Sequence, residues 1–141
     1  MLHTVTRGYP GLVIEDKLCA VCGRRIPWRR SLARDWEHVQ MCSARCRRMG
    51  LGPADHALEA TIISLLGRLP AGATIDPTEA ARLVSGGAGL SLLEPARMAA
   101  RRLVARGAIE ILQNGRVVDP SSARGPIRLR SATRRAAPRS R

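Results

Sequence analysis

The stretch CAVCGRRIPWRRSLARDWEHVQMCSARCRR, residues 19–48, contains all four cysteines of this 141-residue chain. They form two close pairs. Cys19 and Cys22 have C-x2-C spacing and are followed by Gly23, and Cys42 and Cys46 have C-x3-C spacing. A segment of 19 residues separates the two pairs. In the first pair, a tight turn brings both sulfurs and nearby backbone N–H groups toward one point. In the second pair, residues four apart share a face if a helix begins there, and Ser43 is a residue type favoured as a helix N-cap. The spacing therefore predicts that four thiolates converge on one ion.

Four thiolates at about 2.3 Å from the ion form the closed tetrahedral site typical of structural Zn²⁺. A closed site has no open coordination position, which argues against catalytic zinc. An iron–sulfur centre is the alternative, and His38 between the pairs is an alternative ligand. Two tight cysteine pairs in a reducing compartment favour a metal over disulfides. We therefore expect one structural zinc ion, with Cys19, Cys22, Cys42 and Cys46 as its ligands.

Arginines and both tryptophans of the chain lie between the two cysteine pairs. A module this small needs Trp28 and Trp36 for its core, and we expect that role. The alternative is that one of them is a platform on which nucleic-acid bases stack beside the arginines. Arg29, Arg30 and Arg47 are the candidate contacts to nucleic acid in this part of the chain.

The cysteine stretch resembles a small, uncharacterised bacterial zinc-motif family with the pattern CxxCxRPFxWRKKWxxxWxxVxYCSxxCR. Ile26, Leu32 and Met41 stand where that pattern has aromatic residues. More distantly, CxxC…CSxxCR is similar to the zinc-binding DNA gyrase inhibitor family, which implies a module able to bind protein as readily as DNA. The positions that match the first pattern are Cys19, Cys22, Arg24, Trp28, Arg29, Arg30, Trp36, Val39, Cys42, Ser43, Cys46 and Arg47.

Residues 53–130 are predicted to form three helices and a β-hairpin. Apolar residues recur at helical spacing over 57–69. Asp76 and Glu79 form the capping box of a second helix, which ends at a Gly-Gly pair. A third helix is expected over 94–106, followed by a glycine suited to its C-terminal end.

The hairpin is predicted by Asn114-Gly115, the dipeptide typical of a two-residue type I′ turn. That turn places Ile111 opposite Val118 and Leu112 opposite Val117. Downstream, GPIRLR alternates apolar and basic residues and is expected to add a further strand.

Three helices followed by a hairpin is the order of a winged helix, in which the third helix usually enters the DNA major groove and the hairpin is the wing. The predicted fold class is therefore α+β: a small zinc-knuckle or treble-clef-like module followed by a winged-helix domain. Arg97 and Arg101 on the third helix, and Arg116 at the tip of the wing, are further candidate contacts to nucleic acid.

The second half also resembles another uncharacterised bacterial family, over roughly residues 58–130. The stretches that carry this resemblance are PTEAARLV, ARGAIEILQNGRVVDP and ARGPIRLR. It implies a winged-helix-like fold and brings no established activity with it.

Net charge is +13, from 24 basic and 11 acidic side chains. A coding bias toward arginine would explain why nearly all the bases are Arg, but not their excess over acids, which favours a polyanionic partner. The expected organisation is an N-terminal extension (1–16), a zinc-binding module (17–52), a winged-helix-like domain (53–130) and a disordered basic tail (131–141).

Together these features predict a zinc-binding accessory protein that contacts DNA or RNA through arginine-rich surfaces. The alternative is a protein–protein adaptor with a structural zinc and no direct role with nucleic acid. We expect no enzymatic activity, because no Ser/His/Asp order, phosphate loop or carboxylate pair stands out. With no signal peptide or membrane span recognisable, we expect a cytoplasmic monomer without a membrane partner.

Overall fold

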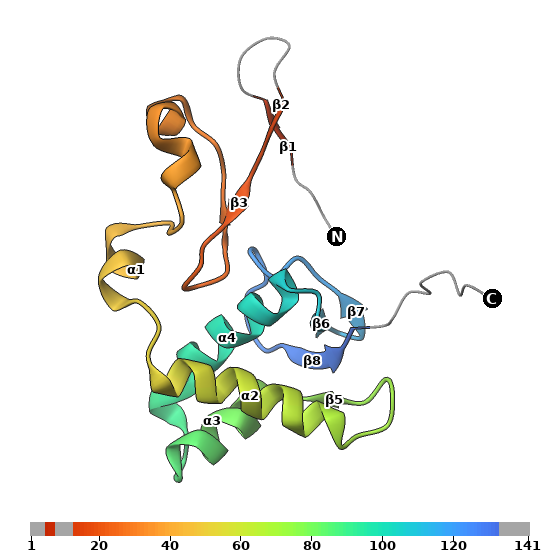
Figure 1. Cartoon of the computed structure of the whole chain (residues 1–141). Coiled ribbons are helices and arrows are strands. Elements are labelled where there is room, and N and C mark those ends of the chain that lie inside the picture. Colours follow the sequence, from red (N-terminus) through yellow and green to blue (C-terminus); the bar gives the residue numbers. More distant parts are fainter. Residues whose placement is uncertain (1–4, 8–12, 133–141) are drawn as a thin grey trace, which may run out of the picture.

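The structure is a computed structural model that describes residues 5–7 and 13–132. The disorder expected of the basic tail falls on residues that lie almost wholly outside this range, as does much of the expected N-terminal extension. The N-terminal part begins with two short antiparallel ribbons (Figure 1). Its elements are β1 (Val5–Arg7), β2 (Val13–Glu15), β3 (Lys17–Leu18), β4 (Arg25–Ile26), the 3₁₀ segment η1 (Arg30–His38) and α1 (Ala44–Met49).

The C-terminal part consists of helices packed beside a four-stranded antiparallel sheet of order β5-β8-β6-β7 (Figure 1). This confirms the predicted α+β class, in which a cysteine-containing part precedes helices and a hairpin. The assignment to the winged-helix fold stays a prediction. The elements are α2 (Pro53–Gly67), β5 (Thr74–Ile75), α3 (Pro77–Ser85), η2 (Leu90–Leu92), α4 (Leu93–Ala105), β6 (Ile109–Gln113), β7 (Arg116–Val117) and β8 (Arg128–Ser131).

Side-chain caps fix where the helices begin. At α3, the Asp76 carboxylate accepts from the Thr78 N–H at 2.8 Å, and the Glu79 carboxylate accepts from the Asp76 N–H at 3.0 Å, so the predicted capping box is confirmed. At α2, Asp55 accepts from the Gly52 N–H at 2.8 Å. That cap starts α2 four residues before the predicted start at 57.

The hairpin forms as predicted. Asn114 and Gly115 have φ angles of 51° and 76°, the two positive values that a type I′ turn requires. Leu112 pairs with Val117 in the expected register. The expected additional strand is β8, which pairs with β6 on one side and with β5 on the other.

The main core lies between α2, α3, α4 and the sheet. Four small or medium residues of α4, Ala96, Ala99, Ala100 and Leu103, are buried there. Leu69, predicted on the buried face of the first helix, is 39% exposed because α2 ends at Gly67. A second cluster contains the three buried cysteines. Its members are Cys19, Val21, Cys22, Ile26 and Cys46, and the partly buried residues packed against it are Leu32, Trp36, Val39, Met41 and Met98.

None of the helices in the described part of the chain is both long and apolar enough to cross a membrane.

Candidate metal centre and arginine surface

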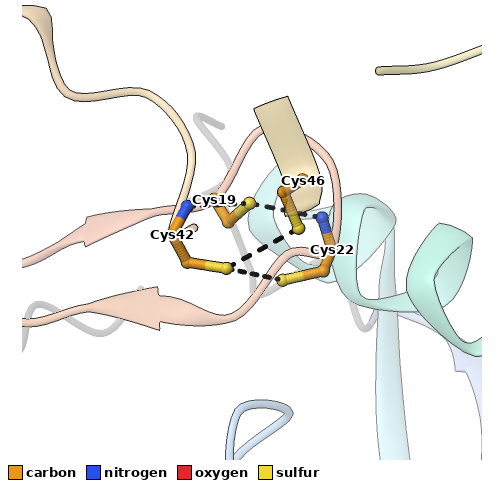
Figure 2. A group of neighbouring side chains, drawn as sticks. All are labelled: Cys19, Cys22, Cys42 and Cys46. Atoms are coloured by element: carbon orange, nitrogen blue, oxygen red, sulfur yellow. Dashed lines mark hydrogen bonds between the residues drawn. The ribbon is translucent and has the colours of Figure 1, made fainter. Parts of the chain in front are cut away.

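The four cysteine sulfurs converge at the end of the β3–β4 ribbon, beside α1 (Figure 2). All four lie within 4.8 Å of one another, and the Cys22–Cys42 and Cys42–Cys46 sulfur pairs are each 3.6 Å apart. A tetrahedral ion with Zn–S bonds of about 2.3 Å requires sulfurs about 3.8 Å apart. The predicted ligands are therefore placed where they can hold one tetrahedral ion.

Backbone hydrogen bonds shape this site. Gly23 donates its N–H to the Cys19 carbonyl at 3.0 Å and closes the C-x2-C turn. The Cys22 and Cys42 N–H groups both donate to the Cys19 sulfur at 3.4 Å. Ser43 caps α1 by accepting from the Cys46 N–H at 3.2 Å, as predicted from CSARC. The turn and the helix start thus orient ligands from two segments toward one point.

The thiols do not share one acidity. Burial acts to raise the pKa of Cys19, but the backbone N–H groups of Cys22, Cys42 and Val21 outweigh it and bring that pKa to about 7. Burial raises the pKa of Cys22 to about 12 and also raises the pKa of Cys46. A metal ion binds thiolates, so loading the site releases protons and becomes harder as pH falls.

The four cysteines are the sole group of three or more metal-ligating side chains found within the described residues. His38, the alternative ligand, is exposed at the end of η1 and does not belong to that group. The donor set is therefore four sulfurs.

The two tryptophans are half-buried. Trp36 packs against the cysteine cluster, and the Lys17 ammonium lies 5.0 Å from the centre of its ring. That ammonium also donates to the carbonyls of Trp36 and Val39. The backbone N–H of Trp28 donates to the Asp16 carboxylate at 3.4 Å. Trp36 thus has the predicted core role, while the core role of Trp28 and base stacking on either tryptophan stay predictions.

Two consecutive arginines of α4 hold the C-x2-C turn. Arg101 donates from Nε to the Cys22 carbonyl, and Arg102 from one Nη to the Val21 carbonyl, both at 2.6 Å. The two side chains are only 4% and 5% exposed. Their cationic donors make stronger hydrogen bonds than neutral ones. The carbonyls of the C-x2-C turn are therefore part of the contact between the two halves of the protein.

Acidic partners balance these buried charges. Glu59 of α2 accepts from Arg102 and Arg106, and Glu94 pairs with Arg101 at 3.1 Å. Burial acts to raise the pKa of Glu59, but the hydrogen bonds from the two arginines outweigh it and hold that pKa below its usual value.

A second contact joins the halves on the other side of the turn. The guanidinium of Arg25 of β4 pairs with the Asp119 carboxylate at 2.7 Å, and the backbone N–H of Arg25 donates to the Ser121 hydroxyl at 2.9 Å. Both acceptors lie in the segment that follows β7. The cysteine-containing part is thus held at α4 and at the loop beyond the hairpin.

Gly23 makes this contact possible, and replacing it tests the contact. A Cβ at this position would lie 2.4 Å from Cβ of Arg101, whereas Gly107 has the same left-handed backbone, φ 77° against 78°, and open space around it. We expect Gly107→Ala to lose about 1–2 kcal/mol of unfolding free energy from the unfavourable φ alone. Gly23→Ala should lose clearly more and retain zinc less well, measured by urea unfolding and chelator competition. Equal losses in the two variants would contradict close docking at Gly23.

The structure separates the arginines predicted to contact nucleic acid. Arg29, Arg30, Arg47 and Arg116 are exposed. Arg101 is buried and engaged within the protein, so it is not available at the surface.

Arg97 is also engaged. It donates to the Gly125 carbonyl at 3.0 Å, lies 3.8 Å from Glu94, and its side chain is 19% exposed. Neither Arg97 nor Arg101 presents a free guanidinium on α4.

Further exposed arginines lie beside the cysteine site on α1, where Arg47 was predicted to contact nucleic acid but Arg45 and Arg48 were not. In α1, Cys46 points inward to the other cysteines. At 100° per residue, Arg45 and Arg47 then lie on the two flanks of the helix and Arg48 on its outer side. None of these three shows an ion pair within the described residues. Helical periodicity counted from Cys46 is the signal that would have found Arg45 and Arg48 in addition to Arg47. The module's exposed set, here called the arginine surface, consists of Arg24, Arg29, Arg30, Arg34, Arg45, Arg47 and Arg48.

Two family models match this chain. Residues 55–132 match a family described as Protein of unknown function (DUF3253), and this match spans more than half of the chain. Residues 13–49 match a family described as Uncharacterized protein conserved in bacteria (DUF2256). No curated protein matches the chain. The two resemblances stated from the motifs thus correspond to two families of unknown function, joined in one polypeptide.

Proposed function

Since this chain belongs to the DUF3253 family and carries a DUF2256 segment ahead of it, we propose that it is a zinc-binding protein that contacts nucleic acid through the arginine surface. The observation that carries this proposal is the construction of α1. One side of the helix supplies Cys46 to the cysteine site, and the other sides carry three exposed arginines. An ion at the cysteines would therefore fix the position of these cations.

The donor set supports zinc. Four thiolates are soft ligands, and tetrahedral S₄ geometry is typical of Zn²⁺ or of iron–sulfur chemistry. Two closely spaced cysteine pairs separated by one short segment are typical of a structural zinc site. Four protein sulfurs would fill all four coordination positions of the ion. The ion supplies folding energy to a segment that buries few large side chains. Its role in this proposal is structural.

The charge balance supports a polyanionic partner. Residues 17–52 contain nine basic and only two acidic side chains. Both acids, Asp35 and Glu37, are exposed, as are seven of the nine bases. Arginine binds phosphate oxygens in two-pronged geometry, and such contacts supply most of the sequence-independent affinity for nucleic acid.

Salt-dependent binding is the expected result. Zinc-loaded protein should bind a mixed-sequence DNA duplex in a fluorescence-anisotropy titration. The logarithm of the association constant should fall linearly with the logarithm of salt concentration, with a slope of about −0.9 for each phosphate contacted. A slope corresponding to several phosphates is expected, also after Arg134, Arg135, Arg139 and Arg141 of the tail are changed to serine. No binding at low salt, or binding lost with the tail arginines, would reject the proposal.

A separate observation favours the alternative of a protein adaptor. Leu83 of α3 is 62% exposed and Leu90 of η2 is 77% exposed. Exposed leucines that form one contiguous apolar patch are typical of a surface that binds another protein. If this alternative holds, a pull-down from nuclease-treated lysate retains one dominant protein, and Leu83→Ser/Leu90→Ser loses it.

A further inference from the structure

The middle of the outward face of α4, at Met98 and Arg101, is covered by the cysteine-containing part of the chain. Residues on this face recur at helical spacing from Glu94 through Arg97, Met98 and Arg101 to Ala105. Met98 packs against the cysteine cluster, and Arg101 is bound to the Cys22 carbonyl. Figure 2 shows the pale teal ribbon of α4 passing beside the cysteine group.

Little of α4 is left for a ligand to touch. Of its thirteen residues, only Glu94 and Ala105 are exposed. A carboxylate repels phosphate, and the alanine side chain has no hydrogen-bonding group. A helix that reads bases needs several exposed side chains able to bond to base edges in the major groove. The third helix, the expected groove reader of a winged helix, therefore has no set of side chains with which to read.

The exposed cations lie on other elements. Arg47 and Arg48 are on α1, Arg116 is at the hairpin, and Arg124 is in the loop that follows it. None of these four forms an ion pair within the described part of the chain. Their elements are a six-residue helix, a two-residue strand and a loop. Such a spread of single cations over separate elements suits phosphates, which present the same charge along every sequence.

We infer that the protein binds the phosphate backbone of duplex nucleic acid without selecting a base sequence, because the metal module occupies the face of α4 that would otherwise enter a groove. This inference rests on the proposed function, and it specifies the ligand as any duplex backbone rather than an operator site. DNA and RNA duplexes share this chemistry.

A selection experiment tests the inference. Full-length, zinc-loaded protein is mixed with a DNA duplex pool carrying 20 random base pairs, and bound and unbound fractions are sequenced. We expect no motif to be enriched more than about threefold, against the 10³–10⁷-fold preference typical of specific readers. Enrichment of one motif by about thirtyfold or more would overturn the inference while leaving the proposed function standing. Absence of binding to the whole pool would instead reject the proposed function.

A parallel titration with an RNA duplex identifies the source of the phosphates. Equal affinity for both polymers supports recognition of charge alone. A preference for one polymer, with no motif enriched in its pool, supports recognition of phosphates at the spacing that the grooves of that duplex set. A motif enriched only in an RNA pool would overturn the inference.

Paired variants connect the result to residues. Arg47→Ala/Arg48→Ala removes two cations of α1. Arg68→Ala/Arg82→Ala removes two exposed cations elsewhere. Arg68 lies just beyond the C-terminal end of α2, which is about 22 Å long and has α1 before its N-terminal end. The first variant should reduce the salt slope by about 2 and lower the affinity for all sequences alike. The second should leave both unchanged. A loss that spares some sequences would show that these arginines read bases, contrary to the inference.

Discussion

Cys19→Ser/Cys22→Ser is expected to abolish stoichiometric zinc binding and to unfold the cysteine-containing part of the chain. The second cluster consists of three cysteines with Val21 and Ile26, and its partly buried neighbours include Trp36. So small a cluster cannot repay the conformational entropy of ordering some thirty residues without the metal. Structural zinc contributes an apparent 10–16 kcal/mol or so to folding in small metal-dependent modules.

Metal analysis and amide NMR spectra measure this effect. The wild-type protein should hold one zinc per chain, and the variant close to none, with collapsed amide dispersion for residues 17–50. His38→Ala is the matched control, because His38 is a potential ligand that lies outside the cysteine group. It should keep one zinc and the wild-type spectrum. A double-cysteine variant that still held one zinc as tightly as wild type would contradict the site.

Glu59→Gln is expected to destabilise the C-terminal part by about 3–5 kcal/mol. Glu59 accepts from Arg102, whose side chain is 5% exposed, so its neutralisation leaves a buried guanidinium without its counter-charge. The control is Glu110→Gln. Glu110 also pairs with an arginine, Arg130, but both side chains of that pair are about a quarter exposed, so about 1 kcal/mol or less is expected. Equal losses in urea unfolding of the two variants would contradict the buried role of Glu59.

The same pair predicts how stability depends on pH. The pKa of Glu59 is lower in the folded protein than in the unfolded chain, where it is about 4.3. Ionised Glu59 therefore contributes its full stabilisation above the unfolded value, and this is lost as pH falls through the folded pKa. Unfolding free energies measured between pH 7 and 3 should fall more steeply for wild type than for Glu59→Gln. Parallel curves would contradict this assignment.

Local signals in the sequence predicted those parts of the fold that depend on neighbouring residues. The capping box at Asp76, the turn at Asn114-Gly115 and the cap at Ser43 each involve groups within a few positions of one another. Their conformational preferences are therefore largely independent of the rest of the chain. The cysteine spacing similarly predicted a site that forms as expected.

The elements that were missed are short or depend on distant partners. β5 has two residues, too few to show a period, and exists because β8 pairs with it from more than fifty residues away. The start of α2 was placed too late because the apolar periodicity begins after its cap at Asp55. The 3₁₀ segment η1 was also missed. Its backbone leaves the helical conformation at Asp35, which divides the segment into two short turns.

The role of Arg101 shows the limit of reading function from a helix face. In the sequence, an arginine on every turn of 94–106 is equally consistent with a DNA-reading face and with a solvated one. The contact that decides its role joins residues 79 positions apart, Arg101 and Cys22. Only the folded chain shows that the C-x2-C turn contacts this face, and that three exposed arginines of the module lie on α1 instead.

The most direct test of the central claim compares nucleic-acid binding with and without the metal. Zinc-loaded protein and protein stripped by a chelator are titrated with the same DNA duplex at several salt concentrations, with tail arginines changed to serine in both. If the metal fixes the arginine surface, stripping should weaken binding by about tenfold or more at low salt and reduce the salt slope by at least about 2. Equal affinity and equal slope in the two forms would contradict the claim that a metal-folded surface binds nucleic acid.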